Sequence, residues 1–158
     1  MRLLDNSQLW YGAKVIGCGG YGTVFRLRNG LVAKVGSVNE DEAITQRFYH
    51  SKRLALPVLA YFESWTTPTI QRKACPKHGA RKHVVDKEAC TCHEMNGVII
   101  MPEAVTGIVT KDEFEYLQER INKLESKHPE LNPWDDRDSN CARYQGVVVG
   151  LDFGYWGV

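Results

Sequence analysis

The chain has 158 residues, 43% of them hydrophobic, and a formal net charge of +1 at pH 7. Its length and composition suit one globular domain or a small two-lobed one. The near-neutral charge argues against a general binder of nucleic acids or membrane surfaces, and no apolar run approaches the roughly 20 residues that span a bilayer. The first residues lack the apolar core of a signal peptide. Five cysteines, three of them close together, indicate a reducing compartment, so we expect a cytoplasmic protein.

The first predicted element is a β-hairpin with a glycine-rich bend at residues 15–35, VIGCGGYGTVFRLRNGLVAKV. Apolar and polar side chains alternate there with the period of strands, and Asn29-Gly30 is a strong short hairpin signal. Lys34 follows one strand after the bend and can reach back to phosphates that the bend holds. The bend contains four glycines without a Cβ, so that backbone N–H groups can approach a phosphate closely: Gly17, Gly19, Gly20 and Gly22.

Three glycines at G-x-G-x-x-G spacing also open dinucleotide-binding units, but a helix should follow the third glycine there. In this chain Thr23-Val24-Phe25 follows and favours a strand. The pattern therefore indicates a strand–loop–strand phosphate loop. The alternative is a glycine-rich hairpin that binds no ligand.

A helix is predicted directly after the hairpin. Two overlapping capping patterns within residues 37–42, Ser-x-x-Glu and Asn-x-x-Glu, predict its start. We expect it to run to about Arg53, with Pro57 as the residue that ends it. Its predicted apolar side consists of Ile44, Phe48 and Leu54.

The following elements are two strands, a helix and a further strand. Residues 58–65 and the apolar run at 97–101 predict strands, the second of them buried. The clearest helix is predicted at residues 110–126, where a Thr-x-x-Glu capping box starts it. After it, the sequence GVVVGL at 146–151 predicts another buried strand. The apolar face of the helix comprises Phe114, Leu117, Ile121 and Leu124.

Hard oxygen donors gather near the C-terminal end. Asp135 and Asn140 are spaced D-x4-N, and Asp152-Phe153-Gly154 follows a predicted strand. Phosphoryl transfer needs a base that orients the acceptor and oxygen ligands that hold Mg²⁺ against the phosphates. We expect Asp135 to be the base and Asn140 and Asp152 to bind magnesium, with Asp136 or Asp138 as substitutes if the register is shifted. The alternative is a solvated acidic loop followed by a turn at the end of a strand.

The order of these features resembles the protein-kinase-like superfamily, and most of all the very small kinase-like proteins of bacteria and their viruses (phages). A glycine loop, Val-Ala-Lys, a capped helix with glutamates, a buried strand, a helix, D-x4-N and Asp-Phe-Gly follow one another. The resemblance covers nearly the whole chain except residues 66–96. It implies an α+β fold, with an N-lobe at 1–103 made of a twisted antiparallel sheet and one helix. A rudimentary C-lobe at 104–158 would carry a helix, the catalytic loop and Asp-Phe-Gly.

The resemblance also implies residue roles in binding ATP. Lys34 would contact the phosphates and Glu42 would hold Lys34, with Glu40 as a rival for that ion pair. Met101–Glu103 would be the hinge that binds adenine through backbone groups. Catalysis would rest on Asp135, Lys34, Asn140 and Asp152. Beyond the four glycines, the implied cofactor contacts are Val24, Ala33, Lys34, Glu42, Met101, Glu103, Asn140 and Asp152.

Two features depart from the family pattern. The usual His-Arg-Asp is replaced by Pro133-Trp134-Asp135, so the arginine that would contact a phosphorylated activation loop is missing. The sequence stops four residues after Gly154, so we expect neither an activation segment nor a helical platform for a peptide substrate.

A polar, basic insert at residues 70–95 carries candidate zinc ligands. It contains C-P-K-H-G and C-T-C-H, and thiolates and imidazoles at such spacing can converge on tetrahedral Zn²⁺. A segment with so little apolar content would draw its folding energy from the metal. The alternative is a loop with incidental cysteines. Four of five candidates would bind: Cys75, His78, Cys90, Cys92 and His93.

Three functions are compatible with these features. The first is a phosphotransferase that uses ATP and Mg²⁺ on a protein or small-molecule acceptor. The second is a pseudokinase-like scaffold that binds and modulates a partner protein, in a host cytoplasm if the source is viral. The third is a zinc-ribbon nucleic-acid binder, which the net charge and the lack of interleaved aromatics in the insert disfavour.

Overall fold

The computed structural model describes residues 13–19, 22–36, 38–63 and 97–153. Within these residues the protein is of mixed α+β class, with two β-sheets and two α-helices. The predicted coarse class is confirmed. No helix in the described part of the chain has the length and apolar character needed to cross a membrane.

The chain forms two compact units. The first comprises Met1–Val38 and Leu59–Met101, and the second comprises Asn39–Val58 and Pro102–Val158. The prediction divided the chain once, after residue 103, whereas in this division the chain passes between the units three times and the first helix belongs to the second unit. The helix belongs there because its Tyr49 is buried in the same cluster as Leu117 and Ile121.

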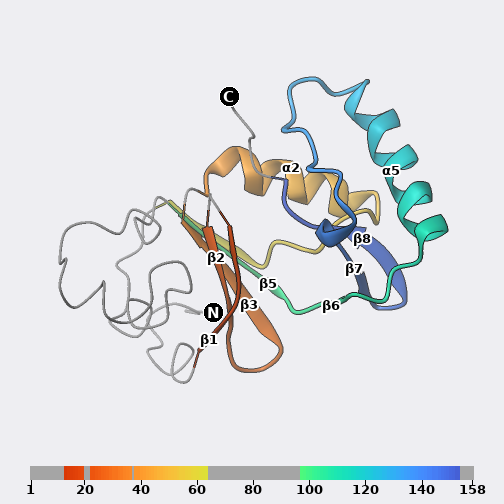
Figure 1. Ribbon diagram of the computed structural model, residues 1–158. Helices are drawn as coiled ribbons and strands as arrows, with labels where there is room; N and C mark the ends of the chain where they lie inside the picture. The colour runs from red at the N-terminus through yellow and green to blue at the C-terminus, as the bar shows by residue number, and fades with distance from the viewer. Residues whose placement is uncertain (1–12, 20–21, 37, 64–96, 154–158) are drawn as a thin grey trace. The chain divides into compact units, whose positions relative to one another are not determined.

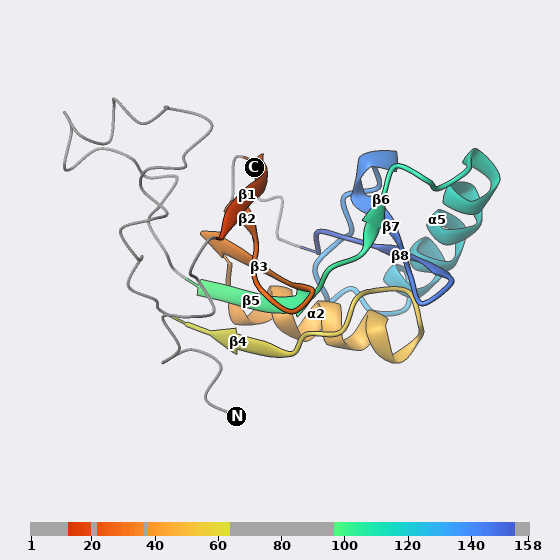
Figure 2. The same cartoon turned by 90° about the horizontal axis from the view of Figure 1, so that it is seen from below.

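The first unit contains a sheet with strand order β1-β2-β3-β5-β4 (Figure 1). The strands are β1 (Lys14–Gly19), β2 (Gly22–Arg26), β3 (Leu31–Gly36), β4 (Ala60–Phe62) and β5 (Gly97–Pro102). β1, β2 and β3 pair antiparallel in succession, and β4 pairs antiparallel with β5 at the sheet edge (Figure 2). The predicted hairpin and the predicted strand at 97–101 are therefore present. Of the strand predicted at 58–65, β4 covers Ala60–Phe62, and residues 64 and 65 lie outside the described part of the chain.

The turn between β2 and β3 forms as the sequence predicts. Asn29 and Gly30 both have positive φ, 61° and 70°, which is the conformation of the two-residue turn that suits the twist of a hairpin. The apolar core of this unit lies on one face of the sheet. Its buried members are Phe25, Leu27, Ala33, Val35, Val98 and Ile100.

The second unit contains the two helices and a small sheet with strand order β6-β7-β8. Its elements are α2 (Glu40–Ser51), β6 (Val105–Thr106), α5 (Lys111–Glu125), β7 (Cys141–Tyr144) and β8 (Val147–Gly150). All pairs in this sheet are antiparallel, and α5 lies beside the β7–β8 hairpin (Figure 1).

Helix α2 begins as predicted, since Asn39 Oδ1 accepts a hydrogen bond from Glu42 N at 3.0 Å. Its end differs from the prediction. The helix stops at Ser51, where Leu54 N donates to Tyr49 O and Arg53 N donates to His50 O. Arg53 has a φ of 60°, so a left-handed C-terminal cap, and not Pro57, ends the helix.

The buried side of α2 agrees with the predicted one only in part: Leu54 is buried just beyond the helix and Phe48 packs against the same cluster, but Ile44 does not. Ile44 is 46% exposed, whereas Thr45 and Gln46 are buried. Their polar groups have partners, because Gln46 Nε2 donates to Leu56 O and Thr45 Oγ1 accepts from Asn132 N. Satisfied polar side chains can therefore form a helix face that hydropathy assigns to solvent. The buried side chains of α2 are Glu42, Ala43, Thr45, Gln46 and Tyr49.

Helix α5 agrees closely with its prediction. Thr110 and Glu113 form a reciprocal capping box, and Leu117 and Ile121 are buried on the predicted face. The Glu113 carboxylate also receives two hydrogen bonds from Arg143 Nη2, at 2.7 and 2.6 Å, which tie the first turn of α5 to β7. One glutamate thus both caps the helix and joins it to the sheet.

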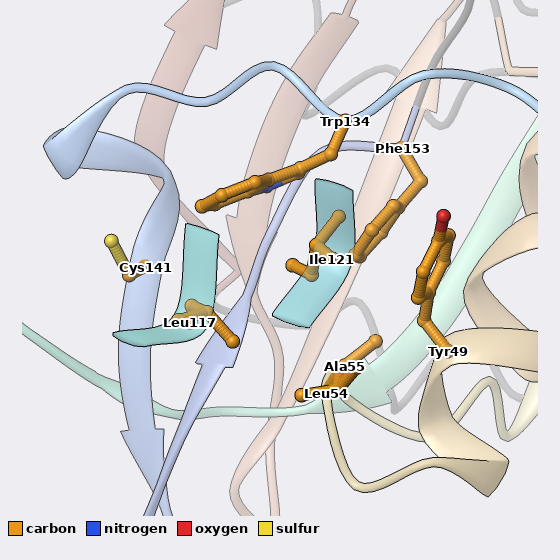
Figure 3. Packing of buried hydrophobic residues seen from close by; sticks show 8 residues of the cluster. All are labelled: Tyr49, Leu54, Ala55, Leu117, Ile121, Trp134, Cys141 and Phe153. Carbon is orange, nitrogen blue, oxygen red and sulfur yellow. The ribbon is translucent and has the colours of Figure 1, made fainter. Parts of the chain in front are cut away.

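The core of the second unit joins α2, α5, the loop after α5 and the β7–β8 hairpin (Figure 3). The rings of Tyr49 and Phe153 stack with centroids 4.9 Å apart and an interplanar angle of 17°. Trp134 lies in the same cluster, so the acidic loop is anchored in the core by an aromatic side chain. The eight buried members are Tyr49, Leu54, Ala55, Leu117, Ile121, Trp134, Cys141 and Phe153.

Two isoleucines on helices test this assignment of the core. Ile121 is fully buried, so Ile121→Ala should lower the free energy of unfolding by about 2–5 kcal/mol. The matched variant Ile44→Ala should change it by no more than about 0.5 kcal/mol, because Ile44 is 46% exposed. Urea denaturation followed by circular dichroism measures both. A larger loss in Ile44→Ala than in Ile121→Ala would contradict the observed burial.

The Glu113–Arg143 pair predicts a pH-dependent part of the stability. The hydrogen bond from Arg143, aided by the backbone N–H of Thr110, holds the pKa of Glu113 below its ordinary value of 4.5. A depressed folded pKa contributes stability above pH 4.5, and this stability is lost as the pH falls through the folded pKa. Wild type should therefore exceed Glu113→Gln in stability at neutral pH, and urea midpoints should converge at acidic pH. A difference in urea midpoint between wild type and Glu113→Gln that stays constant at every pH would contradict this. Glu119→Gln, at an exposed position of the same helix, serves as the control.

Candidate functional site

Two of the predicted ligands, Asn140 and Asp152, lie near the same end of the β7–β8 hairpin. Asn140 directly precedes β7, and Leu151 directly follows β8. Cys141 pairs with Gly150, and beyond this pair Leu151 N donates to Asn140 O at 2.6 Å. The hairpin therefore brings Asn140 next to the residue before Asp152, although 12 positions separate the two predicted ligands in the sequence.

Asp135 is tied to Asn140 by its side chain. Its Oδ2 accepts from Asn140 Nδ2 at 2.7 Å, and Asn140 Nδ2 also donates to Asp135 O at 3.0 Å. Arg137 Nε lies 3.1 Å from Asp135 Oδ1, and the Asp135 side chain is 13% exposed. Because these bonds of Asn140 use the amide nitrogen, its Oδ1 is the atom of the side chain suited to meet a cation.

The two alternative acids have other surroundings. Asp136 is exposed and accepts from Gln118 Nε2 at 2.8 Å. Asp138 is exposed in a short 3-10 turn, and its backbone oxygen accepts from Cys141 Sγ. Of the three aspartates, Asp135 is the one bonded to Asn140, so the geometry favours the register expected from D-x4-N.

Helix α5 holds the loop that carries Asp135. Glu125 Oε1 accepts from Trp134 N at 2.6 Å, and Gln118 binds Asp136. These two α5 residues are seven positions apart and share one face of the helix. The residues on both sides of Asp135 are thus attached to a single rigid element.

Trp134 and Asn132 connect the same loop to the segment around Asp152. Trp134 is 5% exposed, and its indole Nε1 donates to Leu151 O at 2.8 Å. Asn132 is 9% exposed, and its Nδ2 donates to Phe153 O at 3.1 Å. Asp152 lies between these two acceptors and has a φ of 63°. Sequence reasoning noted Trp134 only as a departure from His-Arg-Asp and did not single out Asn132.

A buried tryptophan usually finds a partner for its N–H, so Trp134 offered a weak signal that an acceptor was near. Nothing in the sequence marked Asn132. Cys141, which follows Asn140, is buried, and burial with a smaller effect from Asp138 raises its pKa to about 11. The thiol is therefore poorly reactive at neutral pH.

In the first unit, the strand register decides which predicted residues share a face. Lys34 lies opposite Val24, and Val32 lies opposite Arg26, so these side chains share one face of the sheet. Ala33 points to the other face, where it is fully buried against the core. The structure therefore does not place Ala33 with Lys34, and Val32 takes the neighbouring position on that face. An irregularity in β1 between Val15 and Gly17 pairs Gly17 with Val24.

The predicted hinge coincides with a passage of the chain between the units. Met101 is the last residue of the first unit and is buried, and Pro102 begins the second segment of the second unit. Glu103 is half-buried. In α2, Glu42 is 2% exposed and Glu40 is exposed, so Glu42 is the carboxylate of the two that sits in a protein environment.

Some predicted residues lie outside the described part of the chain. Gly20 is one, while Gly19 and Gly22 pair with each other at the ends of β1 and β2. No group of three or more His, Cys, Asp or Glu side chains suited to a metal occurs among the residues that the structure describes. The five zinc candidates all fall outside those residues: Cys75, His78, Cys90, Cys92 and His93.

Comparison of the chain with protein-family models and with curated proteins finds no match.

The packing around Gly150 gives a test of the site's architecture. A Cβ at this position would lie 3.1 Å from Phe153 Cζ and from Nε1 and Cε2 of Trp134. Gly150→Ala should therefore displace the indole, weaken its bond to Leu151 O and lower the unfolding free energy by about 1–3 kcal/mol. Urea denaturation and amide exchange at residues 151–153 measure this.

The control is Gly17→Ala, since the nearest atom to its Cβ would be Val24 Cβ at an ordinary 3.8 Å. It should be close to neutral in stability. A Gly150→Ala variant as stable and as protected as wild type would contradict the packing of Trp134 against the end of β8.

Proposed function

We propose that this protein binds ATP together with Mg²⁺ and transfers the γ-phosphoryl group to a hydroxyl of a protein or small-molecule acceptor. The observation that carries the proposal is the short bond between Leu151 N and Asn140 O, which ties one predicted magnesium ligand to the residue that precedes the other, Asp152. The Asp135–Asn140 side-chain bond adds the predicted base to the same group. The order of motifs that resembles the protein-kinase-like superfamily supports the same reading.

The donor set suits magnesium. Mg²⁺ prefers oxygen ligands and commonly takes one or two carboxylates, with water and substrate phosphates filling the remaining positions. Asn140 Oδ1 and the Asp152 carboxylate would supply one neutral and one charged oxygen. When bound, the metal supplies charge neutralisation at the phosphates. The chain's own task is to hold these two oxygens in fixed positions.

Asp135 would act on the acceptor. Phosphoryl transfer depends mainly on positioning and electrostatics, and a base aligns the attacking hydroxyl and takes its proton. Donors from Asn140 and Arg137 fix the orientation of the Asp135 carboxylate. The proton of the acceptor hydroxyl would pass to this carboxylate as the oxygen bonds to the γ-phosphorus and the bond to ADP breaks.

Contacts of the first unit to a nucleotide form a separate proposal, which rests on the family resemblance. Lys34 is proposed to contact the phosphates, with Val24 and Val32 on the same face of the sheet. Val32 replaces Ala33 in this proposal because Val32 shares the face of Lys34, although both valine and alanine side chains are buried. Zinc binding at residues 70–95 is a separate proposal, and the nucleotide site does not depend on it.

Thermal denaturation with and without nucleotide tests the binding step. ATP with Mg²⁺ at about 100 times its dissociation constant should stabilise the wild type by about 2.7 kcal/mol, and Mg²⁺ should be required. Asp152→Asn should lose this effect, since it removes the charge while asparagine still tolerates a φ of 63°. Glu119→Gln, an acid-to-amide change on the exposed side of α5, should retain it. No shift with ATP and Mg²⁺ in the wild type would contradict the proposal.

Transfer from γ-labelled ATP to protein or water separates binding from catalysis. Asp135→Asn should lower transfer by roughly 10²–10⁴-fold while Mg²⁺-ATP still stabilises the protein. Asp138→Asn is the matched control in the same loop, and Lys34→Ala tests whether the first unit takes part. ATP binding without any transfer in the wild type, with a partner protein whose binding survives Asp152→Asn, would favour a scaffold over an enzyme.

A further inference from the structure

The backbone around Asp152 is held from both sides by side chains of one loop. On one side, Trp134 Nε1 donates to Leu151 O, which belongs to the peptide group immediately before Asp152. On the other, Asn132 Nδ2 donates to Phe153 O. The ring of Phe153 is fully buried and stacked on Tyr49. Both neighbours of Asp152 are therefore fixed.

Asp152 itself has an unusual backbone conformation. Its φ of 63° lies in the left-handed region, where a residue with a Cβ is disfavoured. Aspartate tolerates this conformation better than most residues with a Cβ, and the surroundings decide whether it is the one adopted. The two hydrogen bonds and the stacked ring are surroundings of this kind, and they act on the residues before and after Asp152.

The two clamping side chains carry N–H donors although they are buried. Trp134 and Asn132 are both buried, and a buried donor without a partner is unfavourable. Each donor therefore stabilises the arrangement in which its acceptor carbonyl is in place. Asn132 is anchored in turn, because its backbone N donates to Thr45 Oγ1 on α2 at 3.1 Å.

We propose that Asn132 and Trp134 are positioning residues, a two-donor clamp that holds Asp152 in the left-handed conformation and so fixes its carboxylate relative to Asn140. One part of this proposal rests on the proposed function, namely that the Asp152 carboxylate binds magnesium. The action of the clamp on the backbone is independent of any ligand. Neither residue contacts the metal or the nucleotide in this scheme.

The clamp is tested by comparing glycine with alanine at residue 152. At a left-handed position glycine is favoured over alanine, whereas in ordinary extended or helical backbone alanine is favoured. Asp152→Gly should therefore have a higher melting temperature than Asp152→Ala in otherwise wild-type protein. In Asn132→Ala, in Trp134→Phe and in the double variant, this difference should shrink or reverse, because the backbone can relax.

A matched control is available in the same hairpin. Gln145 has a φ of 49° in the β7–β8 turn and receives neither clamp bond. The glycine-minus-alanine difference at residue 145 should be the same with and without the clamp. If the difference at residue 152 also stays unchanged in every clamp variant that folds, the clamp is refuted. The conservative Trp134→Phe keeps a ring in the core, so that at least one background retains the fold.

Magnesium affinity at saturating ATP gives the functional readout. Loss of groups that orient metal ligands typically weakens binding about 10–100-fold, so Trp134→Phe and Asn132→Ala should weaken Mg²⁺ by that range. ATP binding without metal should be unchanged. Equal Mg²⁺ affinity in wild type and clamp variants would overturn the positioning role. If wild type binds no Mg²⁺-ATP, the proposed function fails, and the glycine–alanine comparison alone decides on the clamp.

Discussion

The second unit depends on the burial of one indole ring. Trp134 fills the core between α5 and the β7–β8 hairpin, and its N–H reaches the carbonyl that precedes Asp152 (Figure 3). Its backbone N is bound by Glu125 at the end of α5. One residue thereby joins the hydrophobic core, the helix and the strand end. These three attachments of Trp134 constrain the position of Asp135, the next residue in the chain.

The elements that carry this arrangement are well defined by local interactions. Helix α5 has a complete capping box, an apolar face and the Glu113–Arg143 link to β7. The β7–β8 hairpin closes with a two-residue turn in which Gln145 and Gly146 both have positive φ. Polar groups held by such elements keep their geometry better than groups on free loops. The hydrogen bonds around Asp135 and Asn140 therefore describe a pre-organised group of oxygens.

Sequence patterns predicted the parts of the fold whose causes are local. A capping box and a helical period specify α5, and Asn29-Gly30 specifies the β2–β3 turn. The same patterns failed for the buried side of α2, because Thr45 and Gln46 are buried through hydrogen bonds to residues distant in the sequence. Ala33 and Lys34 are neighbours in β3, so the alternation along the strand already placed them on opposite faces, and only the family resemblance grouped them as nucleotide contacts. The register with β2 places Ala33 opposite Phe25, on the face that holds the buried core.

In the candidate site, too, some features could be predicted from local sequence and others depend on contacts distant in the sequence. The spacing of Asp135 and Asn140 and the position of Asp152 after a strand were visible in the sequence. The β7–β8 hairpin explains why Asn140 lies beside Leu151, the residue before Asp152. Asn132 and Trp134 act through bonds to backbone carbonyls at residues 153 and 151. Any residue can in principle accept such a hydrogen bond, since every residue has a backbone carbonyl. Bonds of this kind leave no pattern in the acceptor sequence, and only the three-dimensional structure identifies them.

The proposal that Asn140 and Asp152 hold the metal is tested most directly by locating a bound metal–nucleotide complex on the second unit. In nuclear magnetic resonance spectra of the labelled protein, Mn²⁺ can replace Mg²⁺ with ATP, and its paramagnetism broadens signals of nearby residues. If these two residues hold the metal, broadening should be centred on the side-chain amide of Asn140 and on residues 151–153. The capping turn of α5 at Thr110 should be much less affected. Broadening that is absent from Asn140 and Asp152, or centred elsewhere in the chain, would contradict this proposal.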